Sequence, residues 1–134
     1  MIQKGTYIKV KDNSGVLSGK CINTYKKRVA AYGDLLTLGA TKVKTKLGGS
    51  KKNAFKAQPQ KQALLVIQSR KLVCRLDGSS LKFNSNCGVT ISKSGLKPQL
   101  GFKRINTCVP FELKKHNAGI PFGNNLIKLA KNLA

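Results

Sequence analysis

The residues of this chain that could do chemistry are overwhelmingly cationic. Its 134 residues include 26 Lys and Arg against 4 Asp and Glu, a formal net charge of +22. So few acids cannot neutralise so many cations, and a compact body of this composition repels itself unless a polyanion binds it. Nucleic acid fits this partner best, because each cation that reaches a phosphate releases condensed counterions.

The type of cation narrows the prediction. Four of the 26 are arginines, which leaves 22 lysines. Lysine is a point charge suited to holding phosphate, whereas arginine reads carboxylates, phosphates and base edges bidentately. We therefore expect a protein positioned on a phosphate backbone, with little reading of sequence.

The four acids are spread along the chain at Asp12, Asp34, Asp77 and Glu112. Carboxylate catalysis needs acids that converge at the reacting group, whereas these aspartates accompany turn-forming residues. We expect the three aspartates to cap turns and Glu112 to pair with a nearby Arg or Lys. With no P-loop and no Ser-His-Asp clustering, an enzyme is not expected.

Neither a metal nor a cofactor is predicted. The four cysteines form no CxxC pair, and the single histidine, His116, has no cysteine within ligand spacing. The N-terminus shows no signal-peptide pattern, which favours small buried thiols in a reducing compartment over two disulfides. No apolar stretch is long enough to cross a membrane. Cys108 near His116 could be imagined as a thiol nucleophile, but sequence separation says nothing about geometry.

The elements that position these residues are mostly strands. Residues 6–10 alternate with period two, which places Ile8 and Val10 inward and Lys9 outward, and the turn formers of 12–15 follow. Residues 16–25 read as a second strand and 35–38 as a third. From 41 to 61 seven lysines surround a Gly-Gly-Ser centre, which predicts a basic ribbon or long loop that stands off the body.

The second half continues this pattern. Residues 63–67 form the most apolar run and predict a central buried strand. Asp77-Gly78 is a two-residue hairpin signal, residues 89–91 add a strand, and 92–101 read as loop. Near the end Leu126, Leu129, Ala130 and Leu133 recur at helical spacing, with Asn124 or Asn125 as N-cap. Short strands separated by turns in a small domain predict a closed or partly closed barrel.

An ordered set of residues along the chain resembles the universal ribosomal protein fourteen family of the large subunit. The resemblance covers residues 1–38 and 63–115 well and the last ten residues weakly, while 39–62 does not align well. Its residues are Met1-Ile2-Gln3, Asp12-Asn13-Ser14-Gly15, Cys21-Ile22, Gly33-Asp34, Ala63-Leu64-Leu65-Val66, Asp77-Gly78, Phe83, Asn86, Val89, Gly101, Arg104-Ile105, Val109, Glu112-Leu113 and Leu129-Ala130.

The resemblance implies a mainly β fold: a single domain over 1–134, built as a small five-stranded β-barrel with a projecting β-ribbon and short C-terminal helices. The ribbon or loop would be 41–61 and the helical tail 112–134. It also implies binding to large-subunit rRNA and a place on the intersubunit face, with bridges to small-subunit rRNA. Implied protein neighbours are large-subunit proteins three and nineteen, and a ribosome-silencing factor that docks near Gly101, Arg104 and Ile105.

RNA helices are recognised through shape and phosphate rather than base edges, so the candidate contacts are cations that the barrel could present. We expect RNA contact from Lys9, Lys11, Lys20, Lys42, Lys44, Lys46, Lys51, Lys52, Arg70, Lys71, Arg75, Lys82 and Arg104. The alternative for each is a solvated side chain.

Other interpretations remain open. A free-standing single-strand binder would need aromatic side chains interleaved with charge, and the aromatics look scattered in the sequence. A secreted cationic protein with disulfides would lack free thiols. The abundance of Lys and Asn, and a family motif that starts at Met1, favour a mitochondrial ribosome, with a plastid or bacterial ribosome as the alternative.

Overall fold

The computed structural model describes residues 1–25, 28–43, 61–92, 99–100, 104–114 and 123–134. Five strands close into a barrel: β1 (Tyr7–Val10), β2 (Val16–Thr24), β3 (Leu35–Val43), β4 (Lys61–Gln68) and β7 (Cys87–Ser92). Neighbours pair antiparallel in the order β1-β2-β3-β4-β7, and a parallel β1–β7 pairing closes the ring. The expected small five-stranded barrel is confirmed.

The barrel interior is packed by aliphatic side chains that alternate along the strands. Ile8, Leu36, Leu38, Leu64 and Val66 point inward and are fully buried. Register shifts along β2 let it bend around this interior, as bulges do in small barrels. In β7 the inward position next to this core belongs to a glycine. A Cβ at Gly88 would lie 2.8 Å from the carbonyl oxygen of Leu65 and would overlap the side chain of Leu64, so a larger residue does not fit.

A carboxylate ties the first turn to β7, the strand that pairs with β1 and closes the ring. Asp12 Oδ1 accepts the Ser14 backbone N–H at 2.9 Å, which caps the turn between β1 and β2. Its Oδ2 accepts the backbone N–H of Thr90 at 2.6 Å and the hydroxyl of Thr90 at 2.7 Å. Thr90 is 6% exposed, so Asp12 satisfies two buried donors of β7 while it shapes the β1–β2 turn.

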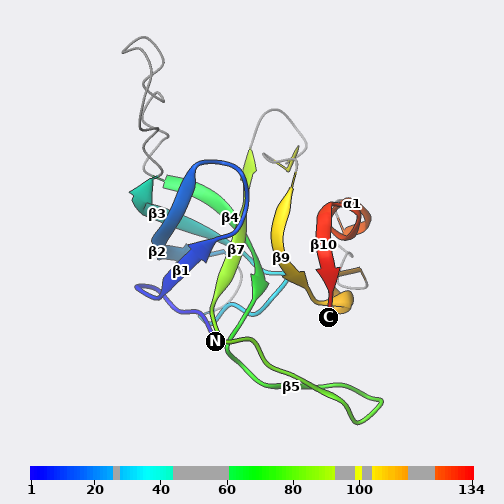
Figure 1. Cartoon of the computed structure of the whole chain (residues 1–134). Helices are drawn as coiled ribbons and strands as arrows, with labels where there is room; N and C mark the ends of the chain where they lie inside the picture. Colours follow the sequence, from blue (N-terminus) through cyan, green and yellow to red (C-terminus); the bar gives the residue numbers. More distant parts are fainter. Residues whose placement is uncertain (26–27, 44–60, 93–98, 101–103, 115–122) are drawn as a thin grey trace.

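A second apolar layer lies outside the barrel. The outward side chains of β4 and β7, among them Leu65, Ile67 and Val89, pack against Ile105, Val109, Leu113 and Leu126. These come from β9 (Ile105–Val109), the 3-10 helix η2 (Phe111–Lys114) and α1 (Gly123–Leu129). Figure 1 shows β4 and β7 standing between the β1–β2–β3 side and these C-terminal elements. We call the outward surface of β4 and β7 the covered face.

The C-terminus differs from the helical prediction. The helix begins at Gly123, so Asn124 and Asn125 lie within it, and it ends at Leu129. Residues Ala130–Leu133 form β10, which pairs parallel with β9. The predicted helical tail over 112–134 therefore contains η2 and α1 but ends in a strand. Pairing with β9 outweighs the helical spacing of Leu126, Leu129, Ala130 and Leu133.

Two other loop predictions change. Gln99–Leu100 (β8) pairs with β7, so the segment 92–101 is not all loop. Val73–Cys74 (β5) and Ser80–Leu81 (β6) form the expected hairpin, which projects from the body in Figure 1. Five residues, 75–79, connect the two strands, so the turn is longer than the expected two residues. Within it the Arg75 carbonyl accepts the Gly78 N–H, and Gly78 has φ +84°, a left-handed value that favours glycine.

The expected ribbon over 41–61 falls mostly outside the described residues. β3 extends to Val43 and β4 begins at Lys61, so the strand pattern predicted for Lys42 and Val43 is confirmed. No helix in the described part of the chain has the length and apolar character that crossing a bilayer requires.

Candidate nucleic-acid interface

The outer surface of β1, β2 and β3 gathers cations that are far apart in the sequence. Cross-strand partners lie on the same side of a sheet, and the register pairs Tyr7 with Lys20, Lys9 with Ser18, and Ser18 with Lys42. Lys9, Lys20 and Lys42 are all exposed. We call this surface, made of Tyr7, Lys9, Ser18, Lys20 and Lys42, the basic face.

A tyrosine lies among these lysines. Tyr7 is 44% exposed, and its hydroxyl shares a 2.6 Å hydrogen bond with Ser18 Oγ. That bond and a second one with Thr41 lower the pKa of Tyr7, with a smaller effect from the positive charges of Lys42 and Lys9. Thr41 Oγ1 also donates to the Ser18 carbonyl at 3.3 Å. Tyr7 is not among the RNA contacts predicted from the sequence, although the alternation that places Lys9 outward places Tyr7 on the same side.

All four acids are engaged away from the basic face. Asp12 holds Thr90, and Asp34 Oδ2 accepts the Ala31 N–H at 2.9 Å. Asp77 Oδ1 accepts the Ser79 N–H at 2.8 Å, and the two hydrogen bonds from Ser79 lower the pKa of Asp77. Turn capping by the three aspartates is therefore confirmed. None of the recorded partners of these acids belongs to the basic face.

The fourth acid, Glu112, pairs with Arg75, as expected from the sequence. Arg75 Nε donates to Glu112 Oε1, and Nη2 donates to Oε2 at 3.3 Å. Partial burial works to raise the pKa of Glu112, but the hydrogen bond and charge of Arg75 outweigh it and hold this pKa below its usual value. The same hydrogen bond raises the pKa of Arg75.

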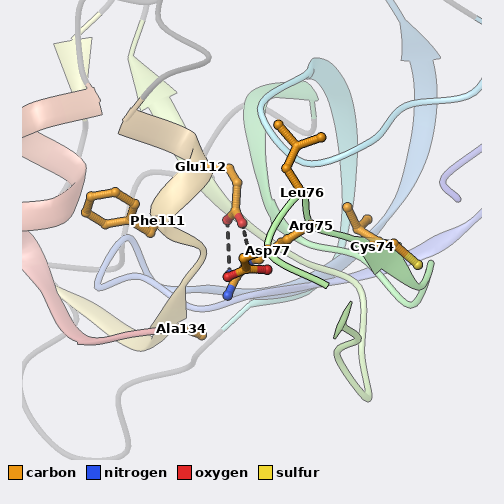
Figure 2. Close-up of a pocket in the computed structure, with 8 residues that line it drawn as sticks. Cys74, Arg75, Leu76, Asp77, Phe111, Glu112 and Ala134 are labelled. Atoms are coloured by element: carbon orange, nitrogen blue, oxygen red, sulfur yellow. Dashed lines mark hydrogen bonds and ion pairs between the residues drawn. The ribbon is translucent and has the colours of Figure 1, made fainter. Parts of the chain in front are cut away.

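A pocket surrounds this ion pair between the β5–β6 hairpin, η2 and the C-terminus. Figure 2 shows Arg75 and Glu112 joined in its middle, with Leu76 and Phe111 among the residues that line it. The pair links the hairpin to η2. Arg75, a predicted RNA contact, thus already has an anionic partner, unlike the lysines of the basic face.

The other predicted contacts lie elsewhere or outside the described residues. Arg70 and Lys71 follow β4, and Arg70 Nε donates to the Asn84 carbonyl at 2.8 Å. Exposed positions after β1, after β6 and before β9 hold Lys11, Lys82 and Arg104. Outside the described residues lie Lys44, Lys46, Lys51 and Lys52. The structure therefore brings together Lys9, Lys20 and Lys42, and separates Arg75.

The described residues include no cluster of His, Cys, Asp and Glu that could hold a metal ion. All four cysteines are free. Cys21 and Cys87 are buried as expected, and burial raises the pKa of the Cys21 thiol. Cys74 is exposed and Cys108 is half-buried, so the prediction of buried thiols is wrong for Cys74 and only partly right for Cys108.

Two comparisons with known proteins give the family of the chain. A family model described as ribosomal protein L14p/L23e matches residues 1–125. The large ribosomal subunit protein uL14 of Carsonella ruddii (strain PV) is 36% identical over 97 residues, which cover 70% of this chain and 74% of the relative. The chain belongs to the ribosomal protein L14p/L23e family, and it is a structural ribosomal protein rather than an enzyme.

Proposed function

We propose that this chain is a constituent of the large ribosomal subunit that binds its rRNA through the basic face. The observation that carries the proposal is the placement of Lys9, Lys20 and Lys42 on adjacent rows of one rigid sheet with no acid beside them. Such a surface costs electrostatic free energy in isolation and recovers it when phosphates replace the condensed counterions. Because the chain belongs to a ribosomal protein family, we infer that the polyanion is ribosomal RNA.

Backbone recognition follows from the chemistry of the face. Its three cations are lysines, which neutralise phosphates without the bidentate geometry that distinguishes bases. The strands fix the positions from which these side chains extend, so the face matches the shape of a folded RNA rather than its sequence. Lys11, Arg70, Lys71, Lys82 and Arg104 would extend the contact, and Arg75 less so because Glu112 already neutralises it.

A charge-matched pair of variants tests this function. The triple variant Lys9→Gln, Lys20→Gln and Lys42→Gln removes three cations from the basic face. The control, Lys4→Gln, Lys128→Gln and Lys131→Gln, removes three exposed cations elsewhere. We expect the first to weaken binding to large-subunit rRNA on the order of 10²-fold near 0.1 M salt, and to flatten the slope of log affinity against log salt by about two to three. Equal losses from both variants would contradict the proposal.

The finer placement follows the same family membership. We propose a position on the intersubunit face, with contacts to small-subunit rRNA, to large-subunit proteins three and nineteen, and to a ribosome-silencing factor near Arg104 and Ile105.

We also propose a mitochondrial ribosome, supported by the abundance of Lys and Asn; the relative from Carsonella ruddii is bacterial. Crosslinking mass spectrometry on large subunits from fractionated cells tests both, and crosslinks only to other proteins, or subunits only outside mitochondria, would contradict them.

A further inference from the structure

Tyr7 is built as a fixed aromatic surface rather than as a core side chain. The ring is 44% exposed, so its burial contributes little to the barrel, whose interior is filled by aliphatic residues. Its hydroxyl is held by Ser18, which is only 5% exposed. A tyrosine anchored at its far end loses little further conformational freedom when a ligand covers it, which favours binding.

The charges around this ring select the ligand. Lys20 lies directly opposite Tyr7 across the β1–β2 pair, while Lys9 and Lys42 flank Ser18 on the next row. An arginine or lysine from a neighbouring protein would be repelled by these three cations. A nucleotide is attracted, because its base offers a flat surface to the ring and its phosphates reach the surrounding ammonium groups.

A second tyrosine on the outward side of the sheet, Tyr25, also has an exposed ring and a hydroxyl that is held by a side-chain hydrogen bond. Tyr25 follows β2, is 50% exposed, and accepts a 2.9 Å hydrogen bond from Thr37 Oγ1. Thr37 lies between the inward Leu36 and Leu38, so it faces outward like the basic face, and it pairs with Asn23. The barrel thus brings together aromatic side chains and lysines that look scattered in the sequence.

We propose that Tyr7 is a stacking platform for one unpaired RNA base, with Lys9, Lys20 and Lys42 binding the phosphates on either side of it. This deepens the proposed function and rests on it. A base inside a duplex is already stacked on both sides, so the platform takes a nucleotide from a single-stranded or bulged segment. Every base has a π-face, so the platform has little base preference.

The test uses the full chain and two labelled RNAs with equal numbers of phosphates, a short oligouridylate and a duplex, with affinity measured by fluorescence anisotropy. Tyr7→Leu removes the ring. We expect it to weaken oligouridylate binding roughly 5- to 150-fold, the range for one stacked base, and to leave duplex binding and the salt slope unchanged. Tyr7→Phe keeps the ring and should keep most of the affinity. Circular dichroism checks that each variant is folded.

The outcomes distinguish a failure of the stacking platform from a failure of the proposed rRNA binding by the basic face. If Tyr7→Leu binds oligouridylate like the parent while the triple lysine variant has lost affinity, the platform is wrong and the basic face stands. If the triple lysine variant matches its charge control, the proposed function itself fails. Photocrosslinking of oligouridylate that carries 5-bromouridine gives a readout independent of affinity: a crosslink at Tyr7 supports the platform, and crosslinks only at other residues overturn it.

Discussion

The basic face and the covered face belong to one barrel but differ in the residues that point outward and in what packs on them. On β4 and β7 the outward positions are Leu65, Ile67 and Val89, and the chain covers them with its own β9, η2 and α1. On β1, β2 and β3 the basic face instead holds three lysines, Tyr7 and Ser18, and none of the recorded partners of the four acids belongs to it. Apolar outward residues therefore mark where the chain packs on itself, and charged ones mark where we expect RNA.

The largest expected effect tests whether the C-terminal elements that pack on the covered face stabilise the barrel. Leu126 of α1 is 1% exposed and packs in the same cluster as Leu65. We expect Leu126→Ala to lower the free energy of unfolding by about 2–5 kcal/mol, through lost burial and the cavity left behind. Urea denaturation of the isolated protein measures this loss.

The matched control for Leu126 lies on the other face. Lys20→Ala, an exposed surface change, should shift the free energy of unfolding by no more than about 0.5 kcal/mol. Similar losses at both positions would remove the distinction between the two faces. A negligible loss at Leu126 would show that the C-terminal elements do not stabilise the barrel.

A smaller effect is expected where the barrel itself is closed. Asp12→Ala leaves the backbone N–H and the hydroxyl of the buried Thr90 without their acceptor. An unsatisfied buried donor costs about 1–3 kcal/mol, and thermal unfolding should show the loss. Asn13→Ala, in the same turn and exposed, is the control and should unfold close to the parent. A stable Asp12→Ala would mean that β1 and β7 are held together by their strand pairing alone.

Much of this arrangement follows from local sequence. Period-two alternation predicted the inward Ile8 and Val10, and the apolar run at 63–67 predicted the central strand. That run is apolar on both sides because Leu64 and Val66 fill the barrel while Leu65 and Ile67 meet the covering elements. The turn-capping role of the three aspartates was also predicted correctly, because a turn aspartate is recognised from its neighbours along the chain.

What the sequence could not supply depends on contacts between distant residues. Ala130–Leu133 has helical spacing, yet it forms a strand because β9 offers a free edge beside it. Tyr7 and Lys42 are 35 positions apart in the numbering, and only the pairing of β2 with both β1 and β3 places them on one surface. Eight of the nine predicted cations that the structure describes are exposed. The sequence predicted that Glu112 pairs with an Arg or Lys, but it could not identify Arg75 as that partner.

The smallest expected effect concerns Arg75, the one predicted contact with an acid of its own. The folded-state pKa of Glu112 lies below its unfolded value of about 4.3. The ion pair therefore adds stability that is fully present above that pH and is lost as pH falls through the lower, folded-state value. We expect the melting temperatures of the parent and Glu112→Gln to differ most near neutral pH and to converge below about pH 4. A constant difference down to strong acid would show that packing at Glu112, rather than its charge, links the hairpin to η2. It would also leave Arg75 as free to bind phosphate as the lysines of the basic face.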